Sequence, residues 1–284
     1  MKFGLHSVNL HTCAYPDTAA KLGRAAEAAG FESLWVADHV VLPDPPVAGR
    51  PMAPDMRLLE PIVALTFLAA HTSRVKLATG VIILPQRQAV VLAKQLASLD
   101  VLSNGRVIFG LGVGWCEPEM ASTGASFKER GRIGDDYLAA MRALWTKPKP
   151  EHHGPYVSFA GVQAMPRPVQ QPIPIVVGGN TPPAHRRAVS QGNGWYGFGF
   201  DVAATQKSVA ALRDAEKKAS RPAALGRLEI SITPPGYDVP DKATIDAYAS
   251  AGVDRLIIRP RPDMDVAALE RFATDTGRAL GLRG

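Results

Sequence analysis

The residues with the clearest capacity for chemistry are Asp38 and His39, which follow the apolar segment 33–37 in the stretch SLWVADHV. A histidine beside a carboxylate can be held in one tautomer and can exchange a proton near neutral pH. If 33–37 is a parallel strand, both side chains lie at its carboxyl end, where α/β barrels carry out chemistry. The pattern leaves open whether His39 is catalytic or only packs and hydrogen-bonds at the rim.

The other titratable residues give weaker signals. His11 is the second candidate, because His6 and His11 flank the end of the first predicted strand, whereas His71, His152, His153 and His185 fall on helices or loops, where solvated side chains are expected. Glu60, Glu117 and Glu119 look like isolated acids, and no mechanism is based on them. No metal-ligand spacing or nucleophile motif is present, so we expect no metal site.

Two glycine-rich stretches come at the ends of predicted strands. Gly110, Gly112 and Gly114 end segment 106–113, where the backbone could approach a flat ligand or a phosphate or could simply relieve crowding. Their G-x-G-x-G spacing, with no clear helix directly after it, disfavours a Rossmann dinucleotide site. We expect the pocket to include Gly112, Val113 and Gly114.

The second stretch is Gly178, Gly179, Asn180 and Thr181, between a predicted strand and a helix whose N-cap is Thr181. Free amides at a helix start favour a phosphate, and Arg186 and Arg187 could add positive charge. A plain tight turn remains the alternative. Trp115 and Trp195 also stand at strand ends, where each could form an aromatic wall or only pack.

Alternating strand and helix patterns position these residues. The predicted strands are 2–9, 33–37, 75–84, 106–113, 173–177, 194–199, 227–233 and 255–259, and the predicted helices are 17–29, 58–71, 89–102, 131–145, 183–191, 203–219, 242–251 and 266–280. Leu92, Leu96 and Leu99 form one apolar stripe on the third helix, which ends at Asn104 and Gly105. Eight such pairs predict an α/β fold, a (β/α)8 TIM barrel, formed by residues 1–284 as a single domain.

Two predicted connections are longer than ordinary βα links. Residues 39–57 follow the second strand, and residues 146–172 precede the fifth. Extended loops on a barrel usually shape the substrate mouth or a subunit contact. The sequence does not distinguish these two roles.

Composition limits the partners. The chain of 284 residues has a formal net charge of +6, but its Lys and Arg residues are scattered, so we expect no nucleic acid partner. No apolar run reaches transmembrane length, no signal peptide is recognised, and the two cysteines lack a metal-like spacing, so we expect a cytoplasmic protein that binds no membrane. An anionic small ligand or an ordinary basic surface would explain the charge.

Five ordered motifs resemble the bacterial luciferase-like monooxygenase superfamily: ADHV, TGVIILP, LDVLSNGRVIFGLGVGW, RPVQQPIPIVVGGNTP and GNGW. More narrowly, they are similar to its branch that depends on the deazaflavin coenzyme F420. The resemblance is strong over residues 1 to about 200, and the last third matches only in pattern.

The resemblance implies a ring-binding site in the barrel mouth, bounded by Asp38, His39, Gly112, Val113 and Gly114. It also implies a non-prolyl cis peptide between Val81 and Ile82 behind the ring, and a phosphate site at Gly178–Thr181. His39 matches a histidine that assists catalysis in some deazaflavin enzymes. F420 is the expected cofactor and FMN the alternative, and a homodimer is expected.

The chain also departs from the family's sugar-phosphate dehydrogenases. Where these have glutamates after strands one and four, this sequence offers Asn9, Leu10 or His11 and Trp115. We expect a substrate pocket formed by Asn9, His11, Trp115 and Trp195. Sugar-phosphate oxidation is therefore disfavoured, and an uncharged, more apolar substrate is expected. The expected activity is hydride transfer between F420 and a small organic molecule. An FMN-dependent monooxygenase and a non-catalytic flavin-binding protein remain alternatives.

Overall fold

The computed structural model describes residues 1–49 and 52–283, and within these ranges eight parallel strands close into a barrel. In order around the ring the strands are β3 (Lys76–Thr79), β2 (Ser33–Val36), β1 (Lys2–His6), β11 (Arg255–Ile258), β10 (Glu229–Thr233), β9 (Gly194–Phe198), β8 (Ile175–Gly178) and β5 (Val107–Gly112). Pairing of β3 with β5 completes the ring. The predicted TIM barrel is confirmed.

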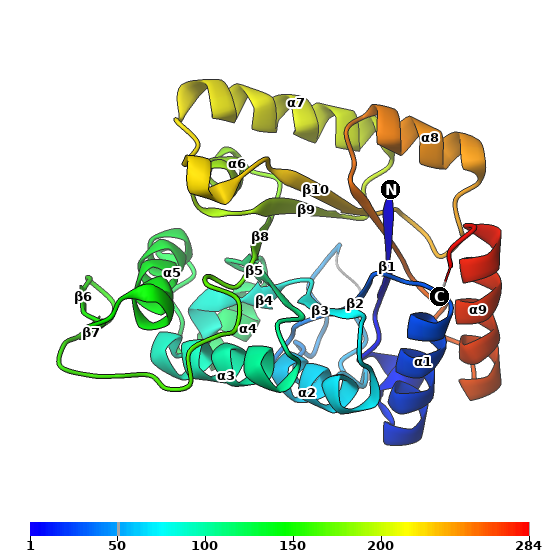
Figure 1. Ribbon diagram of the computed structural model, residues 1–284, viewed down its shortest axis with the longest axis horizontal. Coiled ribbons are helices and arrows are strands. Elements are labelled where there is room, and N and C mark those ends of the chain that lie inside the picture. Colours follow the sequence, from blue (N-terminus) through cyan, green and yellow to red (C-terminus); the bar gives the residue numbers. More distant parts are fainter. Residues whose placement is uncertain (50–51, 284) are drawn as a thin grey trace.

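Helices surround these strands (Figure 1). They are α1 (Pro16–Ala28), α2 (Pro61–His71), α3 (Ala89–Leu102), α4 (Glu117–Ser122), α5 (Arg130–Thr146), α6 (Pro182–Gln191), α7 (Val202–Lys218), α8 (Lys242–Ser250) and α9 (Val266–Ala279). Several begin at side chains that accept an otherwise unpaired amide: Asp201, Asp241 and Asp265 each bind the N–H three residues later at 2.7–2.8 Å. The predicted end of α3 is also confirmed, because Asn104 and Gly105 both have positive φ.

Apolar side chains fill two regions. The larger region lies between strands and helices and includes Leu34, Leu77, Phe109 and Val177. The smaller one contains Trp35, Ala78, Ile108, Val176, Tyr196 and Ile257. The alternation of side chains along each strand therefore supplies both a helix-facing layer and an interior layer.

A buried ion cluster lies at the amino ends of β10 and β11. The Arg255 guanidinium donates two hydrogen bonds to the Glu32 carboxylate at 2.9 and 3.0 Å, one to Ser231 Oγ at 2.9 Å and one to Glu229. It also lies 5.7 Å from the centre of the Trp35 ring, which stacks on Tyr196. This cluster joins β10 and β11 to the turn before β2.

The predicted third strand, residues 75–84, is interrupted. It divides into β3 and the short β4 (Ile82–Ile83), with a cis peptide bond between Gly80 and Val81. The predicted position, between Val81 and Ile82, is one residue too late. A Cβ at Gly80 would lie 3.0 Å from Trp35 and 3.1 Å from His6, so glycine is favoured at this break in the strand.

Two further predicted boundaries are wrong. The first strand ends at His6 rather than Asn9, because Ser7 adopts a left-handed φ of 64°. A helix does follow the glycines of β5 closely, since α4 begins at Glu117, with Pro118 in its first turn. Short 3-10 helices also occur at His11–Ala14, Leu84–Gln86 and Ala223–Leu225.

The two extended connections have different roles. Residues 146–172 contain the hairpin β6 (His152–His153) and β7 (Ser158–Phe159) beside α5 (Figure 1). Asp136 of α5 accepts hydrogen bonds from His152, Tyr156 N and Val157 N at 2.8–3.1 Å, which fixes the hairpin on the outside of the barrel. The described part of 39–57 instead borders the barrel mouth.

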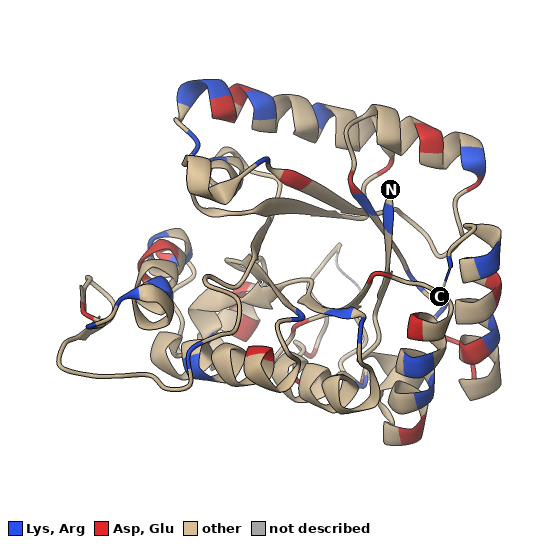
Figure 2. Ribbon diagram, viewed as in Figure 1, with Lys and Arg blue, Asp and Glu red and all other residues tan. Residues whose placement is uncertain are grey.

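Charged residues are mixed on the outer helices. Both basic and acidic residues occur on each of α7, α8 and α9 (Figure 2). Among the described residues, no helix combines the length and the apolar character required to cross a membrane.

Candidate active site

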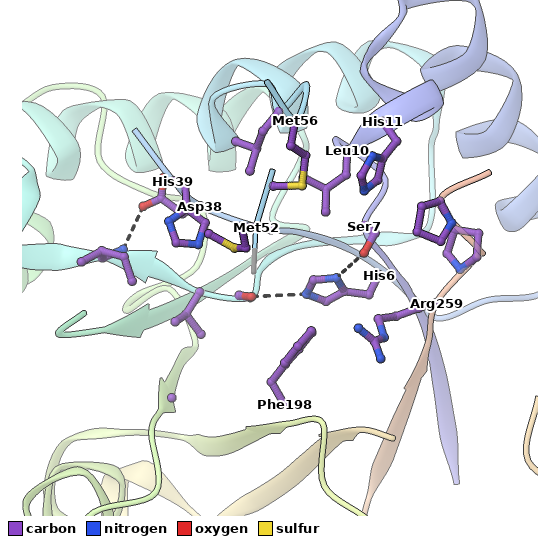
Figure 3. A pocket seen from close by; sticks show the side chains of 18 of the residues that line it. His6, Ser7, Leu10, His11, Asp38, His39, Met52, Met56, Phe198 and Arg259 are labelled. Carbon is purple, nitrogen blue, oxygen red and sulfur yellow. Dashed lines mark hydrogen bonds between the residues drawn. The ribbon is translucent and has the colours of Figure 1, made fainter. Parts of the chain in front are cut away.

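A cavity of about 1120 Å³ opens at the carboxyl ends of the barrel strands. Residues that follow β1, β2, β8, β9 and β11 line it, together with Gly49, Met52 and Met56 of the long connection after β2. Figure 3 shows these side chains converging from several elements. The volume is larger than most single-ligand pockets, so a flat cofactor and a small substrate could share it.

His39 lies in the cavity wall and is held by Glu119. Its Nδ1 donates a hydrogen bond to Glu119 Oε2 at 2.8 Å, and the other carboxylate oxygen accepts from Val40 N at 2.7 Å. The Glu119 side chain is only 1% exposed. Because Nδ1 is the donor in this pair, Nε2 is the nitrogen left to exchange a proton with a ligand.

Glu119 is the functional candidate that sequence reasoning missed. It lies on α4, the helix that the sequence pattern did not predict, and reaches a residue 80 positions earlier. The available signal was an acidic residue shortly after a strand end, the same kind of position as His39 itself. The sequence around Glu119 does not indicate its partner, because only the fold brings His39 next to it.

Asp38 borders the cavity, but both of its oxygens have protein partners. Oδ2 accepts from Ile83 N at 2.9 Å, and Oδ1 accepts from Arg87, which also binds Glu60. The carboxylate therefore joins the end of β2 to the segment after the cis peptide. Its predicted contact with a cofactor stays a prediction, and its observed role is to fix the wall around Ile83.

Val81 projects into the cavity and explains most of the glycines around it. An ideal Cβ at Gly112 would lie 2.8 Å from a Val81 methyl, and one at Gly178 would lie 3.1 Å from another. At Gly110 it would lie 1.8 Å from Thr79 O. These glycines make room for the protein's own chain, so the crowding alternative is the correct one for β5.

Four residues predicted around the ring therefore lie elsewhere. Ile82 is buried in the outer core, and Gly112, Val113 and Gly114 do not line the cavity. Val81 and Ile83 cover this side instead, and Gly114 packs against Ile83 and Met120. The apolar surface offered to a ligand is formed by side chains rather than by open backbone.

The predicted phosphate site is present only in part. Gly178, Gly179 and Asn180 line the cavity, and the Asn180 side chain accepts from Ser208 Oγ at 3.0 Å. Thr181 does not line it, because its hydroxyl is turned back to Ala184 N as the N-cap of α6. Pro182 and Pro183 have no N–H, so the donors near this helix start are the amides of residues 179–181.

Of the two neighbouring arginines, one is paired elsewhere. Arg187 is buried and donates to Asp135 at 2.6 and 3.0 Å, whereas Arg186 is exposed. The charge of Arg187 is therefore compensated by Asp135 and is not available to a phosphate at Gly178–Thr181.

The predicted substrate residues divide into two groups. His11 and Trp115 line the cavity. Asn9 does not, because it is fully buried and clamps the chain: its side chain donates to Ala37 O and Leu59 O at 2.9 and 2.8 Å and accepts from Ala37 N at 3.0 Å. Trp195 is also fully buried, on the outer face of β9, where its Nε1 donates to Gly179 O at 2.8 Å.

Another part of the wall carries residues that the sequence did not single out as a site. His6 Nε2 lies 3.3 Å from Gly80 O, and Nδ1 lies 3.0 Å from Ser7 Oγ (Figure 3). A carbonyl only accepts, so Nε2 carries the proton and Nδ1 accepts from the hydroxyl. Burial lowers the pKa of His6 to about 4, and the ring is neutral at physiological pH. Phe198 and Arg259 lie beside it.

Comparison with known proteins identifies the relatives of this chain. Residues 1–271 match the family model described as luciferase-like monooxygenase. An uncharacterised protein of Mycobacterium tuberculosis is 34% identical over 268 residues, which cover 90% of this chain and 93% of that protein. An F420-dependent glucose-6-phosphate dehydrogenase of Amycolatopsis mediterranei is 31% identical over 203 residues, covering 69% of this chain and 58% of that enzyme.

Solved structures of low sequence identity share the fold. An F420-dependent secondary alcohol dehydrogenase in complex with an F420-acetone adduct has a TM-score of 0.79 at 16% identity, over 100% of this chain and 99% of that one. A riboflavin lyase with modified FMN also has a TM-score of 0.79 at 16% identity, over 100% and 92%. Of these two structures, one contains F420 and the other a modified FMN. The barrel, the cavity at its mouth and the match over nearly the whole chain together establish that this protein belongs to the luciferase-like monooxygenase family, whose oxidoreductases use flavin or deazaflavin.

Proposed function

We propose that this protein is an F420-dependent oxidoreductase that transfers a hydride between the deazaflavin and a small organic substrate. The observation that carries the proposal is the His39–Glu119 pair in the cavity wall. Hydride transfer to or from a carbon bearing oxygen also requires a proton to be delivered or removed. His39, oriented through Nδ1, supports that role at Nε2.

The cavity fits a deazaflavin or a flavin. Val81 and Ile83 offer an apolar surface against which one face of a ring system could lie, and the amides of residues 179–181 are suited to a phosphate. When bound, the coenzyme would supply the redox chemistry, accepting or donating the hydride. The protein would hold the ring, exclude water with the apolar wall and exchange a proton at His39.

The similarity to an F420-dependent dehydrogenase of Amycolatopsis supports the deazaflavin, as does the basic composition, which suits the anionic tail of F420. The alternative is an FMN-dependent monooxygenase that uses reduced flavin and oxygen. It is favoured by a 29% identity over 179 residues, covering 62% of this chain and 46% of the other, to the oxygenase component of a flavin-dependent trigonelline monooxygenase of Acinetobacter baylyi.

Titration of the purified protein with F420 and with FMN tests the cofactor. We expect tighter binding of F420, and preferential binding of FMN would contradict the proposal. Gly178→Ala tests whether this part of the cavity binds the cofactor. The added Cβ would lie 3.1–3.2 Å from the Val81 methyls and would displace the Val81 side chain in the cavity wall. It should weaken cofactor binding while the far-ultraviolet circular dichroism stays unchanged.

Hydride transfer across a panel of alcohols, aldehydes and ketones, each with and without a carboxylate group, then separates an enzyme from a binding protein. We expect F420 reduction or oxidation, followed by its absorbance, with at least one substrate class. Tight cofactor binding without turnover of any member would favour the non-catalytic alternative.

A further inference from the structure

Arg259 is a cation in the cavity wall that forms no ion pair with a carboxylate of residues 1–49 or 52–283. It follows β11 and points toward the cavity beside His6 and Phe198 (Figure 3). Its guanidinium lies 4.8 Å from the ring centres of both Phe198 and Tyr237. Stacking of this kind holds the planar group in place without neutralising its charge.

The hydrogen bonds of Arg259 leave most of its donors open. Nη2 donates to Gly236 O at 2.7 Å, whereas Nε is buried and has no hydrogen-bond partner within the described parts of the chain. Burial lowers the pKa of Arg259, but a guanidinium in a protein remains protonated. A half-buried charge without an anion is costly, so a ligand that supplies one is favoured.

The other ionisable residues around the cavity do not provide that anion. Asp38 is paired with Arg87 and Glu119 with His39, and Asp55 is exposed on the loop. His6 is neutral, and burial raises the pKa of Tyr196 well above its usual value, so that ring is neutral too. The positive charge of Arg259 therefore faces the ligand space uncompensated.

We propose that Arg259 binds the carboxylate of the substrate, and that the protein acts on small organic acids. A carboxylate matches the planar, forked donors of a guanidinium, and the rings of Phe198 and Tyr237 would contact the apolar part of the same molecule. This inference rests on the proposed function and narrows its substrate class. The uncharged substrate expected from Trp115 is replaced by one that is apolar at one end and anionic at the other.

Position favours the substrate over the cofactor as the source of the anion. In the barrel order, β11 is separated from β8 by β10 and β9, so Arg259 and the amides of residues 179–181 are three strands apart. His39 follows β2, with only β1 between β2 and β11. If a cofactor phosphate binds near residue 179, Arg259 remains available to bind a second anion in the part of the cavity where His39 lies.

Calorimetric titration with matched acids and amides tests the proposal. The probes are benzoate and benzamide, phenylacetate and phenylacetamide, and propanoate and propanamide, added to the protein alone and to the protein saturated with F420. In the wild type, at least one acid should bind about 10- to 100-fold more tightly than its amide, the range expected for a charged hydrogen-bonded pair. The proposal is overturned if none of the three acids binds more tightly than its amide.

Variants assign that preference to Arg259. Arg259→Gln should reduce it at least about 10-fold, and Arg259→Lys, which keeps the charge but loses the fork, should retain part of it. Arg57→Gln is the matched control, because Arg57 also lines the cavity but is exposed and stacks on Tyr15 at 4.3 Å. An equal loss in Arg57→Gln would show a general charge effect and contradict the proposal.

Titration of the wild type and of Arg259→Gln with F420 separates this inference from the proposed function. Arg259→Gln should leave F420 affinity unchanged, and loss of F420 binding in a folded variant would assign the anion to the cofactor and overturn the inference. If the wild type prefers acids but fails to bind F420, the proposed cofactor is wrong and the anion site stands. Should Arg259→Gln not fold, the wild-type preference and Arg259→Lys still decide the result.

Discussion

Nδ1 of His39 and Oε2 of Glu119 lie 2.8 Å apart although the two residues are separated by 79 others in the chain. The histidine follows β2 and the glutamate belongs to α4, which follows β5, so the connections after two strands that are separated by β3 in the barrel meet at this hydrogen bond. The second Glu119 oxygen accepts from Val40 N, which fixes the backbone that carries the histidine. Glu119 therefore positions His39, which is the member of the pair that lines the cavity.

Removal of His39 should reduce turnover. His39→Ala is expected to lower kcat about 100-fold or more, because a positioned proton donor or acceptor contributes that much. Glu119→Gln should lower kcat up to about 100-fold, since a misplaced catalytic group costs a comparable factor, and should change cofactor affinity little. Stopped-flow measurement of F420 absorbance gives kcat and KM separately.

His153→Ala serves as the control for these substitutions. His153 is exposed on the β6–β7 hairpin, where it contacts Ser158, and does not line the cavity. Its loss should leave kcat unchanged. A wild-type kcat in His39→Ala would remove His39 from the mechanism. A change in KM with an unchanged kcat in Glu119→Gln would contradict a positioning role.

The Arg255 cluster should dominate stability at the closed end of the barrel. Arg255→Met removes the partner of Glu32 and Glu229 and is expected to cost about 3 to 5 kcal/mol in the free energy of unfolding. Arg227→Met is the matched comparison, because the Arg227 side chain is 73% exposed in its pair with Asp254, and its loss should cost about 1 kcal/mol or less. Urea denaturation of both variants measures the difference. Equal losses would show that burial of the cluster contributes nothing.

Gly110 should tolerate no side chain. Gly110→Ala would place a methyl 1.8 Å from Thr79 O, so β3 and β5 must separate, and we expect a loss of about 3 kcal/mol. Gly131→Ala is the opposite case: the nearest atom is Arg187 Nη2 at 3.7 Å, and alanine in α5 should add about 0.5 kcal/mol. Thermal unfolding reports both signs, and an unchanged melting temperature in Gly110→Ala would refute the predicted clash.

Stability should fall in mild acid because of His6. Its pKa is lowered from 6.5 to about 4 in the folded protein, so the unfolded chain binds more protons between these values. The free energy of unfolding should therefore decrease as the pH falls from about 6.5 to about 4, by about 3 kcal/mol from this group. His6→Gln should abolish that part of the pH dependence. A wild type and a variant with parallel stability curves across this range would contradict the assignment.

The sequence predicts the barrel because its signals are local. Apolar strands, helix stripes and caps such as Asp201 and Asp241 depend on neighbours a few residues away, and they place most elements correctly. The glycine at the interruption of the third strand instead packs against Trp35 and His6, which are brought there by other strands. A continuous apolar run such as 75–84 carries no sign of those contacts.

The candidate site shows the same division. His39 can be identified from its place after a strand, and Glu119 cannot, because its significance comes from a contact across the fold. Asn9 and Trp195 are also near strand ends, but neither side chain lines the cavity. Asn9 hydrogen-bonds to the backbone of Ala37 and Leu59, and Trp195 packs in the outer core. Likewise, the glycines of β5 accommodate Val81, a contact that the glycine spacing does not reveal.

The connection after β2 is fastened at both ends. Glu119 binds Val40 N at its start, and at its end Leu58 bridges Leu10 while Leu59 N donates to Asn9 O at 3.0 Å. The described residues between these anchors contribute Met52 and Met56 to the cavity and belong to no strand of the barrel. This segment can therefore change in sequence without disturbing the barrel strands, and such changes would alter the surface that the cavity offers to a ligand.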